Sequence, residues 1–174
     1  MTLLLNLNGI DVRLKIWNYT PKSDNDWTAD WCKTDVSFTA ESWMDYKLEE
    51  DEVFLSCELE QLYEKLGLLL DGKLTEREEL EMMEPDFTFI FYPRQDLRED
   101  PRVTHVRSGY EIIDISVDWT VTFWHKGLTN NYLSVELGRD EIGYLRAYLE
   151  LVMGKRSEDD AAIEALVSLG VLLP

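Results

Sequence analysis

The chain has 174 residues, of which 45% are hydrophobic and 11% aromatic, so it can form one hydrophobic core and is not a disordered acidic tail. It carries 35 acidic and 17 basic side chains, a formal net charge of −18. Nucleic acid and anionic membranes are therefore poor partners, because phosphate contacts need clustered lysine and arginine. No window approaches the ~18 apolar residues of a spanning helix, and the N-terminus lacks a basic signal-peptide segment. We expect a soluble, cytoplasmic protein.

Strand signals dominate the first part of the chain. In "LLLNLNGIDVRLKIW", Asn8-Gly9 is a favoured two-residue turn between β-prone runs, which predicts a hairpin. Apolar and polar residues alternate in "WCKTDVSFTAE", which predicts a half-buried strand. The stretch "SWMDYKLE" is its expected antiparallel neighbour.

Leucine spacing then changes to a helical period. The stretch "SCELEQLYEKLGLLLDG" predicts a helix capped by Ser56 and ended by Asp71-Gly72. Two further helices are expected in "GRDEIGYLRAYLELVMG" and "SEDDAAIEALVSLGVLL", the second capped by Ser157.

The remaining segments have strand character. "REELEMMEPDFTFIFYP" predicts two strands separated at Glu84-Pro85-Asp86, and "YEIIDISVDWTVTFWH" pairs with "TNNYLSVEL". No internal repeat or linker divides the chain. The sequence therefore predicts a single α+β domain over residues 1–174, mainly an antiparallel sheet of about eight strands with two or three helices. Residues 154–174 are expected to form a C-terminal helical extension.

The negative charge is concentrated in one part of the chain. Residues 49–86 contain 14 acidic and three basic side chains, a net charge of −11. The densest point is a run of four consecutive carboxylates, Glu49, Glu50, Asp51 and Glu52. Three interpretations stay open for this acidic run: a solvated turn before the helix, a surface for a basic partner, and a metal site.

A second cluster of acidic residues loosely imitates a calcium-binding loop. Ala29 stands where such a loop has its turn glycine, and Asp35 stands where it has a long bidentate glutamate. We favour an aspartate-rich surface loop and predict no metal site. The residues of the pattern are Asp24, Asp26, Thr28, Asp30 and Asp35.

No catalytic signature is present in the sequence. Asp114 and Asp118 share one strand face but would lie ~13 Å apart, beyond the ~5–9.5 Å of glycosidase pairs. The two histidines, His105 and His125, have no triad or nucleophile-elbow context. We predict a protein that is not an enzyme and has no cofactor; a carboxylate and divalent-cation hydrolase is the less favoured alternative.

Tryptophans supply the candidate anchors for a partner. Trp119 falls on the apolar face of its strand and is expected in the core. Trp124 falls on the polar face of the same strand, where it lies either under another segment or exposed to a partner. With Trp43 and Trp27, it joins the acidic run as a candidate partner-binding residue.

The sequence resembles the WapI-type bacterial immunity proteins. The likeness rests on "DWTADWCKTDVSFTAESW", "CELEQLYEKLGLLLDG" and "NYLSVELGRDEIGYLRAYLELV", and covers about residues 8–153. The acidic run and residues 157–174 have no counterpart in it. The resemblance implies cytoplasmic, non-enzymatic binding to the domain of a contact-delivered toxin, commonly a nuclease. The acidic charge agrees with a basic toxin as partner, and a general protein-interaction module is the alternative.

Overall fold

The structure is a computed structural model, and it describes residues 1–21, 30–84, 86–124 and 127–174. These residues form three helices and eleven strands. In chain order the elements are β1 Thr2–Leu7, β2 Ile10–Trp17, β3 Trp31–Ala40, β4 Met44–Leu55, α1 Ser56–Leu70, β5 Glu78–Glu81, β6 Phe87–Tyr92, β7 Gln95–Asp96, β8 Ile112–Ile113, β9 Ser116–Trp124, β10 Leu128–Leu137, α2 Arg139–Val152, α3 Ala161–Ser168 and β11 Leu172–Leu173.

The strands of this described part pair in three antiparallel sheets. The first has the order β11-β1-β2-β3-β4, the second β10-β9-β6-β5, and β7 pairs with β8. The predicted α+β class is confirmed, and so are the eight predicted strands, since β7, β8 and β11 have only two residues each. Both adjacent hairpins β1–β2 and β9–β10 lie where the sequence predicts them.

The first hairpin turns through Asn8-Gly9 as predicted. Both residues have positive φ, 55° for Asn8 and 90° for Gly9. Such a pair of left-handed residues matches the twist of the flanking strands, and asparagine and glycine tolerate it best. The turn sets the register in which Leu3, Leu5 and Leu7 are buried on one face of β1.

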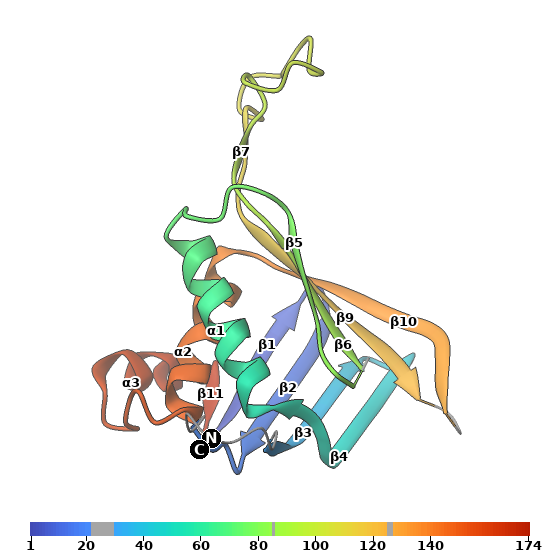
Figure 1. Ribbon diagram of the computed structural model, residues 1–174, viewed down its shortest axis with the longest axis vertical. Helices are drawn as coiled ribbons and strands as arrows, with labels where there is room; N and C mark the ends of the chain where they lie inside the picture. Colours follow the sequence, from blue (N-terminus) through green and yellow to red (C-terminus); the bar gives the residue numbers. More distant parts are fainter. Residues whose placement is uncertain (22–29, 85, 125–126) are drawn as a thin grey trace.

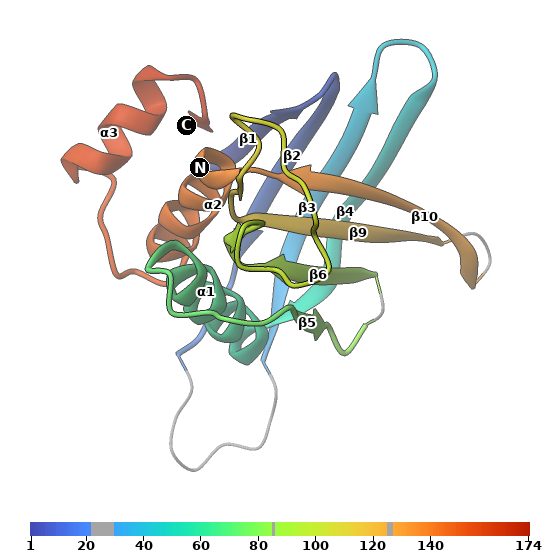
Figure 2. The same ribbon diagram turned by 90° about the horizontal axis from the view of Figure 1, so that it is seen from above.

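The hydrophobic core lies between the two large sheets and the helices α1 and α2 (Figure 1). Strands of one sheet run across those of the other, and α1 lies beside α2 (Figure 2). Trp119 on β9 is fully buried and contacts aromatic rings from both sheets. The buried leucines of α1 follow the predicted helical spacing; they are Leu59, Leu62, Leu66 and Leu69.

Two helix caps differ from the expectation. Leu55, not Ser56, occupies the N-cap of α1, and the side chain of Glu58 accepts the backbone N–H of Leu55 at 2.8 Å. Asp160, not Ser157, caps α3, where its Oδ1 accepts the backbone N–H of Ala162 at 2.9 Å. In both helices a carboxylate satisfies an N–H group that the first turn leaves without a helical partner.

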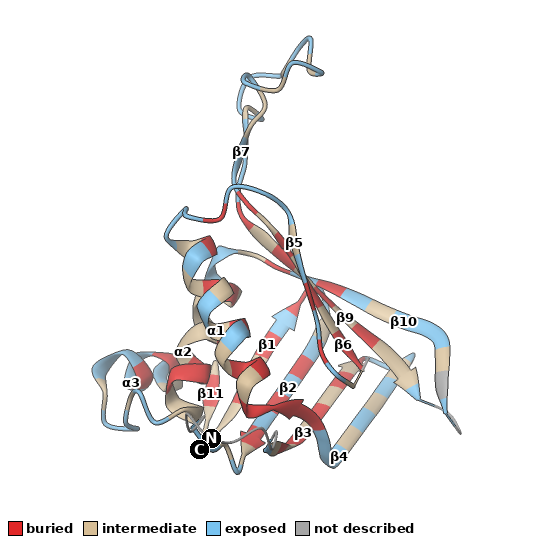
Figure 3. Cartoon of the chain, viewed as in Figure 1, coloured by how far each residue is buried: buried red, intermediate tan, exposed pale blue. Residues whose placement is uncertain are grey.

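The segment between β6 and β9 forms an arm that projects from the rest of the molecule (Figure 1). Residues 94–114 of this arm include no buried residue (Figure 3). Short ion pairs link neighbouring residues along it, such as Arg98 with Asp96 and Arg102 with Asp100. The arm is held by local contacts and by the β7–β8 pairing.

The C-terminal extension is not only helical. After α3, strand β11 pairs antiparallel with β1, so that Thr2 lies opposite Leu173. The two chain ends lie close together in both views (Figures 1 and 2). Ile163 and Leu172 are fully buried, and they join this extension to the core. No helix of the described residues is long and apolar enough to cross a membrane.

Candidate partner-binding site

The acidic run lies inside strand β4 and is not a turn before the helix. Pairing of β4 with β3 shifts register twice here, between Cys32 and Thr34 and again between Thr34 and Val36. Each shift inserts an extra residue into β4, which is the definition of a β-bulge. A bulge re-aims the side chains that follow it, so four consecutive carboxylates need not share one surface.

Carboxylates complete the hydrogen bonding of this irregular strand. Glu50 has a φ of 54°, and its backbone N–H donates to Oδ1 of Asp35 at 2.8 Å. The backbone N–H of Glu52 donates to Oδ1 of Asp51 at 2.9 Å. These bonds occupy backbone donors that the interrupted ladder leaves free. Asp35, the last residue of the pattern that loosely imitates a calcium-binding loop, therefore supports the bulge.

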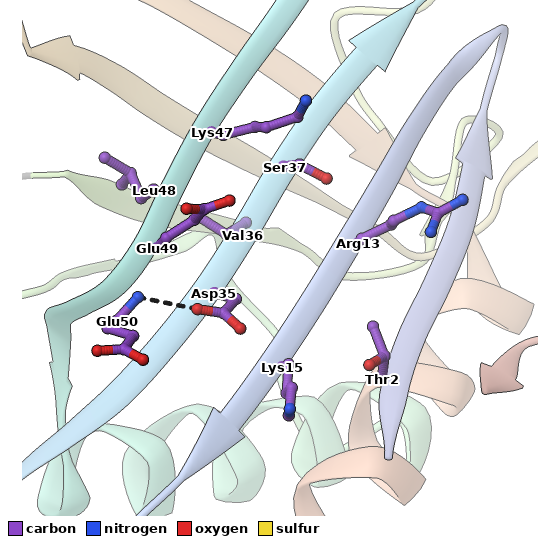
Figure 4. Close-up of a pocket in the computed structure, with 10 residues that line it drawn as sticks. All are labelled: Thr2, Arg13, Lys15, Asp35, Val36, Ser37, Lys47, Leu48, Glu49 and Glu50. Atoms are coloured by element: carbon purple, nitrogen blue, oxygen red, sulfur yellow. Dashed lines mark hydrogen bonds between the residues drawn. The ribbon is translucent and has the colours of Figure 1, made fainter. Parts of the chain in front are cut away.

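The first half of the acidic run lies among basic side chains. Glu49 and Glu50 line an open pocket of about 540 Å³ on the face of the first sheet (Figure 4). Its other lining residues are Thr2, Arg13, Lys15, Asp35, Val36, Ser37, Lys47 and Leu48. Three cations thus balance three carboxylates, and Lys15 lies opposite Asp35 in the strand register. This pocket has no excess negative charge.

The second half of the run lies in a different environment. Asp51 and Glu52 line a pocket of about 520 Å³ that we call the tryptophan pocket. Its lining residues are Trp31, Leu48, Asp51, Glu52, Glu84, Asp86 and Trp124. Among the described residues, its carboxylates have a single ion pair, between Glu52 Oε1 and Lys33 Nζ at 2.7 Å. Negative charge is concentrated in this pocket.

Strand pairing brings the distant members of the tryptophan pocket together. Phe87 on β6 lies opposite Val121 on β9, and the backbone carbonyl of Asp86 accepts the N–H of Thr122 at 2.8 Å. This places Asp86 beside Trp124, whose indole Nε1–H donates to Oδ1 of Asp86. Trp124 is still 41% exposed, so its ring is fixed by the hydrogen bond of its indole N–H and is also accessible to solvent.

Asp86 is the buried acid of the tryptophan pocket. The residue is only 6% exposed, and no lysine or arginine of the described residues forms an ion pair with it. Burial, followed by the nearby carboxylates of Asp51 and Glu84, raises its pKa from 3.8 to about 6. Near neutral pH the pocket therefore contains a buried negative charge that no described lysine or arginine pairs with.

Asp86→Asn is expected to stabilise the protein near neutral pH. The folded pKa of about 6 lies above the ordinary value of 3.8. The contribution of the Asp86 carboxyl group to the free energy of unfolding is therefore fully present below pH 3.8 and is lost as pH rises through 6. The amide cannot ionise, yet its oxygen can still accept the Trp124 indole N–H. We expect a free energy of unfolding higher by about 1–2 kcal/mol at pH 7, with little difference at pH 4.

Urea unfolding followed by circular dichroism at both pH values checks this expectation. Asp159→Asn is the matched control, since it removes one carboxylate from an exposed position. Equal effects of the two substitutions at pH 7 would contradict an energetic cost specific to Asp86.

The structure brings together only some of the predicted partner-binding residues. Trp43 is 65% exposed in the turn between β3 and β4, and it lines neither pocket. Trp27 lies outside the described residues, as do Asp24, Asp26 and Thr28 of the calcium-type pattern. Within the described chain, no group of three or more histidine, cysteine, aspartate or glutamate side chains has an arrangement suited to a metal ion.

Four residues of the tryptophan pocket were not predicted. Trp31, Leu48, Glu84 and Asp86 join it through strand pairing, which the sequence pattern does not specify. One feature of the sequence did point to the pocket: Trp124 is a large aromatic residue on the otherwise polar face of its strand. The structure shows that its indole N–H donates to Asp86. A large indole on a polar strand face indicates a neighbouring acceptor.

The residues considered for catalysis have other surroundings. Asp114 binds Arg139 through Nε at 2.9 Å and through a second guanidinium nitrogen, which lowers the Asp114 pKa to about 2. His105 lies on the exposed arm, and His125 lies outside the described residues. Asp114 therefore forms an ion pair joining β8–β9 to the start of α2.

These observations define an antiparallel α+β protein with an acidic, tryptophan-lined pocket formed by residues of its two large sheets and of the segment between β5 and β6. Its sequence matches the immunity protein WapI-like family over residues 3–155, and the chain belongs to that family. The match includes the acidic run and ends before residues 156–174. No curated protein matches the chain. Family membership supports a role as an immunity protein.

Proposed function

We propose that this chain is a cytoplasmic, non-enzymatic immunity protein that binds and neutralises a cognate basic toxin domain through its acidic surface. The family supports the immunity role. The observation that carries the finer proposal is the tryptophan pocket, where four carboxylates share one cation among the described residues. A nuclease domain is a suitable partner class, because a protein that holds phosphates presents basic side chains.

The acidic surface acts in two stages in this proposal. Long-range attraction first brings the basic toxin domain to the acidic side of the molecule and can raise the association rate constant to ~10⁸–10⁹ M⁻¹s⁻¹ at low salt. Attraction alone gives little residence time, so close contacts must then hold the complex. Trp124 is suited to this second stage, since tryptophan is enriched among residues that dominate binding energy.

Replacing Glu49, Glu50, Asp51 and Glu52 together by lysine tests the proposal. The association rate constant with the cognate toxin domain is expected to fall at least about tenfold at low salt, because reversed charges repel a basic partner. The salt dependence of the rate should also become weaker. Stopped-flow or surface-based kinetics at two salt concentrations measures both quantities.

A control separates local charge from net charge. Glu158 and Asp159 are exposed and lie outside the residues matched by the family. Their joint reversal to lysine should lower the association rate much less for each charge changed. An unchanged rate in the fourfold variant, with a folded toxin domain that binds the wild type, would show that the acidic run does not face the toxin.

A further inference from the structure

We propose that the tryptophan pocket receives one arginine side chain of the toxin domain. This inference rests on the proposed function and identifies the chemistry of the contact. The pocket provides carboxylates from two separate segments and indole rings from two strands. An arginine guanidinium is the protein group that uses both kinds of surface, since it binds carboxylates through paired hydrogen bonds and stacks on aromatic rings.

The first argument is unbalanced charge. Asp51 and Glu52 come from β4, while Glu84 and Asp86 come from the segment between β5 and β6. Only Glu52 has an ion pair with a described cation, Lys33. The other three carboxylates repel one another within one cavity. A cation that enters this cavity relieves their repulsion, and its desolvation is offset by several acceptors.

The second argument is the buried carboxyl group of Asp86. Its Oδ1 accepts the Trp124 indole N–H, and the residue contributes to the pocket lining although it is only 6% exposed. A buried carboxylate is costly unless it is paired with an opposite charge. No described lysine or arginine supplies that charge. Among the described residues, Asp86 is therefore a buried acceptor that lacks an ionic partner, and a cation entering the pocket would supply one.

The third argument is the pair of indole walls. Trp31 and Trp124 both line the pocket, and Trp124 keeps 41% of its surface exposed. A guanidinium is attracted to the face of an indole ring, and arginine is found in this geometry more often than lysine. Arginine is also less strongly hydrated than the lysine ammonium group, so it enters a partly buried site at lower cost.

Arginine binding in this pocket has a proton signature. A guanidinium beside Asp86 favours the ionised carboxylate and lowers its pKa below the value of about 6 in the free protein. Among the described residues, Asp51, Glu52 and Glu84 are the other titratable groups that line the pocket. Lys33 is paired with Glu52, and Tyr46 lies near enough to interact electrostatically with Asp86 and Asp51. Complex formation near pH 6 should therefore release a fraction of a proton from Asp86. Toxin contacts that lie away from the pocket would leave the Asp86 pKa unchanged and release no proton from it.

The chain alone can be tested with a small probe. N-acetyl-arginine methylamide is titrated into the full chain at pH 7 while NMR follows the indole N–H signals of the tryptophans. We expect a saturable shift of the Trp124 signal, with affinity reduced about tenfold or more in the double variant Asp51→Asn with Glu84→Gln. The matched control, Glu49→Gln with Glu50→Gln, should bind like the wild type, because those carboxylates line the other pocket.

Three results of this titration would overturn the inference. They are the absence of a saturable shift, equal binding by the double variant and the wild type, and a stronger response to N-acetyl-lysine methylamide or to calcium chloride. Calcium is included because clustered carboxylates are also suitable ligands for a hard cation.

Calorimetry with the toxin domain separates this inference from the proposed function. Measurements at pH 6 in two buffers of different ionisation enthalpy should show proton release for the wild type and none for Asp86→Asn. If the toxin binds tightly without proton release and the double variant binds equally well, the pocket inference fails and the immunity function stands. If the probe binds but the toxin does not, the proposed function fails and the arginine site remains.

Discussion

Replacing Trp119 by alanine is expected to lower the free energy of unfolding by about 3–5 kcal/mol. The Trp119 ring is fully buried between the two large sheets. Its ring centre lies 5.3 Å from that of Phe38 on β3, and 5.4 Å and 5.5 Å from those of Phe87 and Phe89 on β6. Removing the indole leaves a cavity where both sheets meet, and closely packed rings cannot close it without moving a strand.

Trp119→Phe provides the control for this cavity. The indole Nε1 has no hydrogen-bond partner among the described residues, so phenylalanine removes a buried donor while it keeps an aromatic ring. We expect Trp119→Phe to cost much less than Trp119→Ala. Denaturant unfolding of both variants measures the difference. Nearly equal losses would contradict the assignment of the cost to the cavity that alanine leaves.

Glu58→Gln is expected to lower the free energy of unfolding by about 2 kcal/mol, although the two side chains have nearly the same shape. Glu58 is 7% exposed, and its two oxygens have different partners. Oε2 accepts the Leu55 N–H at 2.8 Å, and Oε1 accepts the N–H of Met83. Glutamine has one oxygen, so its amide N–H₂ must face one of the two backbone donors.

The loss should include local loosening beside the tryptophan pocket. Through Met83, Glu58 holds the segment between β5 and β6, which also carries Glu84 and Asp86, against the start of α1. Hydrogen exchange should therefore quicken at Met83 in the variant. Glu64→Gln is the matched control on the exposed side of α1, and we expect less than about 0.5 kcal/mol from it. An equal loss in both variants would assign the effect to helix charge alone.

The sequence predicts most of the fold because period and turn chemistry are local properties. The Asn8-Gly9 hairpin, the alternating strand β3 and the leucine face of α1 follow from residues close together in the chain. Strands β7, β8 and β11 could not be predicted in this way, because two residues are too few to show an alternation of apolar and polar side chains. Their existence depends on a partner, as Leu172 and Leu173 depend on β1.

The candidate site was only partly predictable for the same reason. The acidic run is evident in the sequence, but two bulges divide it between two pockets, and no periodic pattern survives there. Asp86 and Trp124 are 38 positions apart and meet through the pairing of β6 with β9. Trp43 was predicted as a candidate anchor together with Trp124, yet it lies in a turn that neither pocket includes.

The position of β4 gives the acidic run a second consequence. β4 is the outermost strand of its sheet, and an unpaired strand edge can recruit another chain and begin aggregation. Bulges and charged side chains prevent such recruitment, and residues 49–52 provide both. Alanine substitutions there would remove this protection along with the negative charge. Lysine substitutions keep a charged edge, so a loss of toxin binding in them would not be confused with self-association.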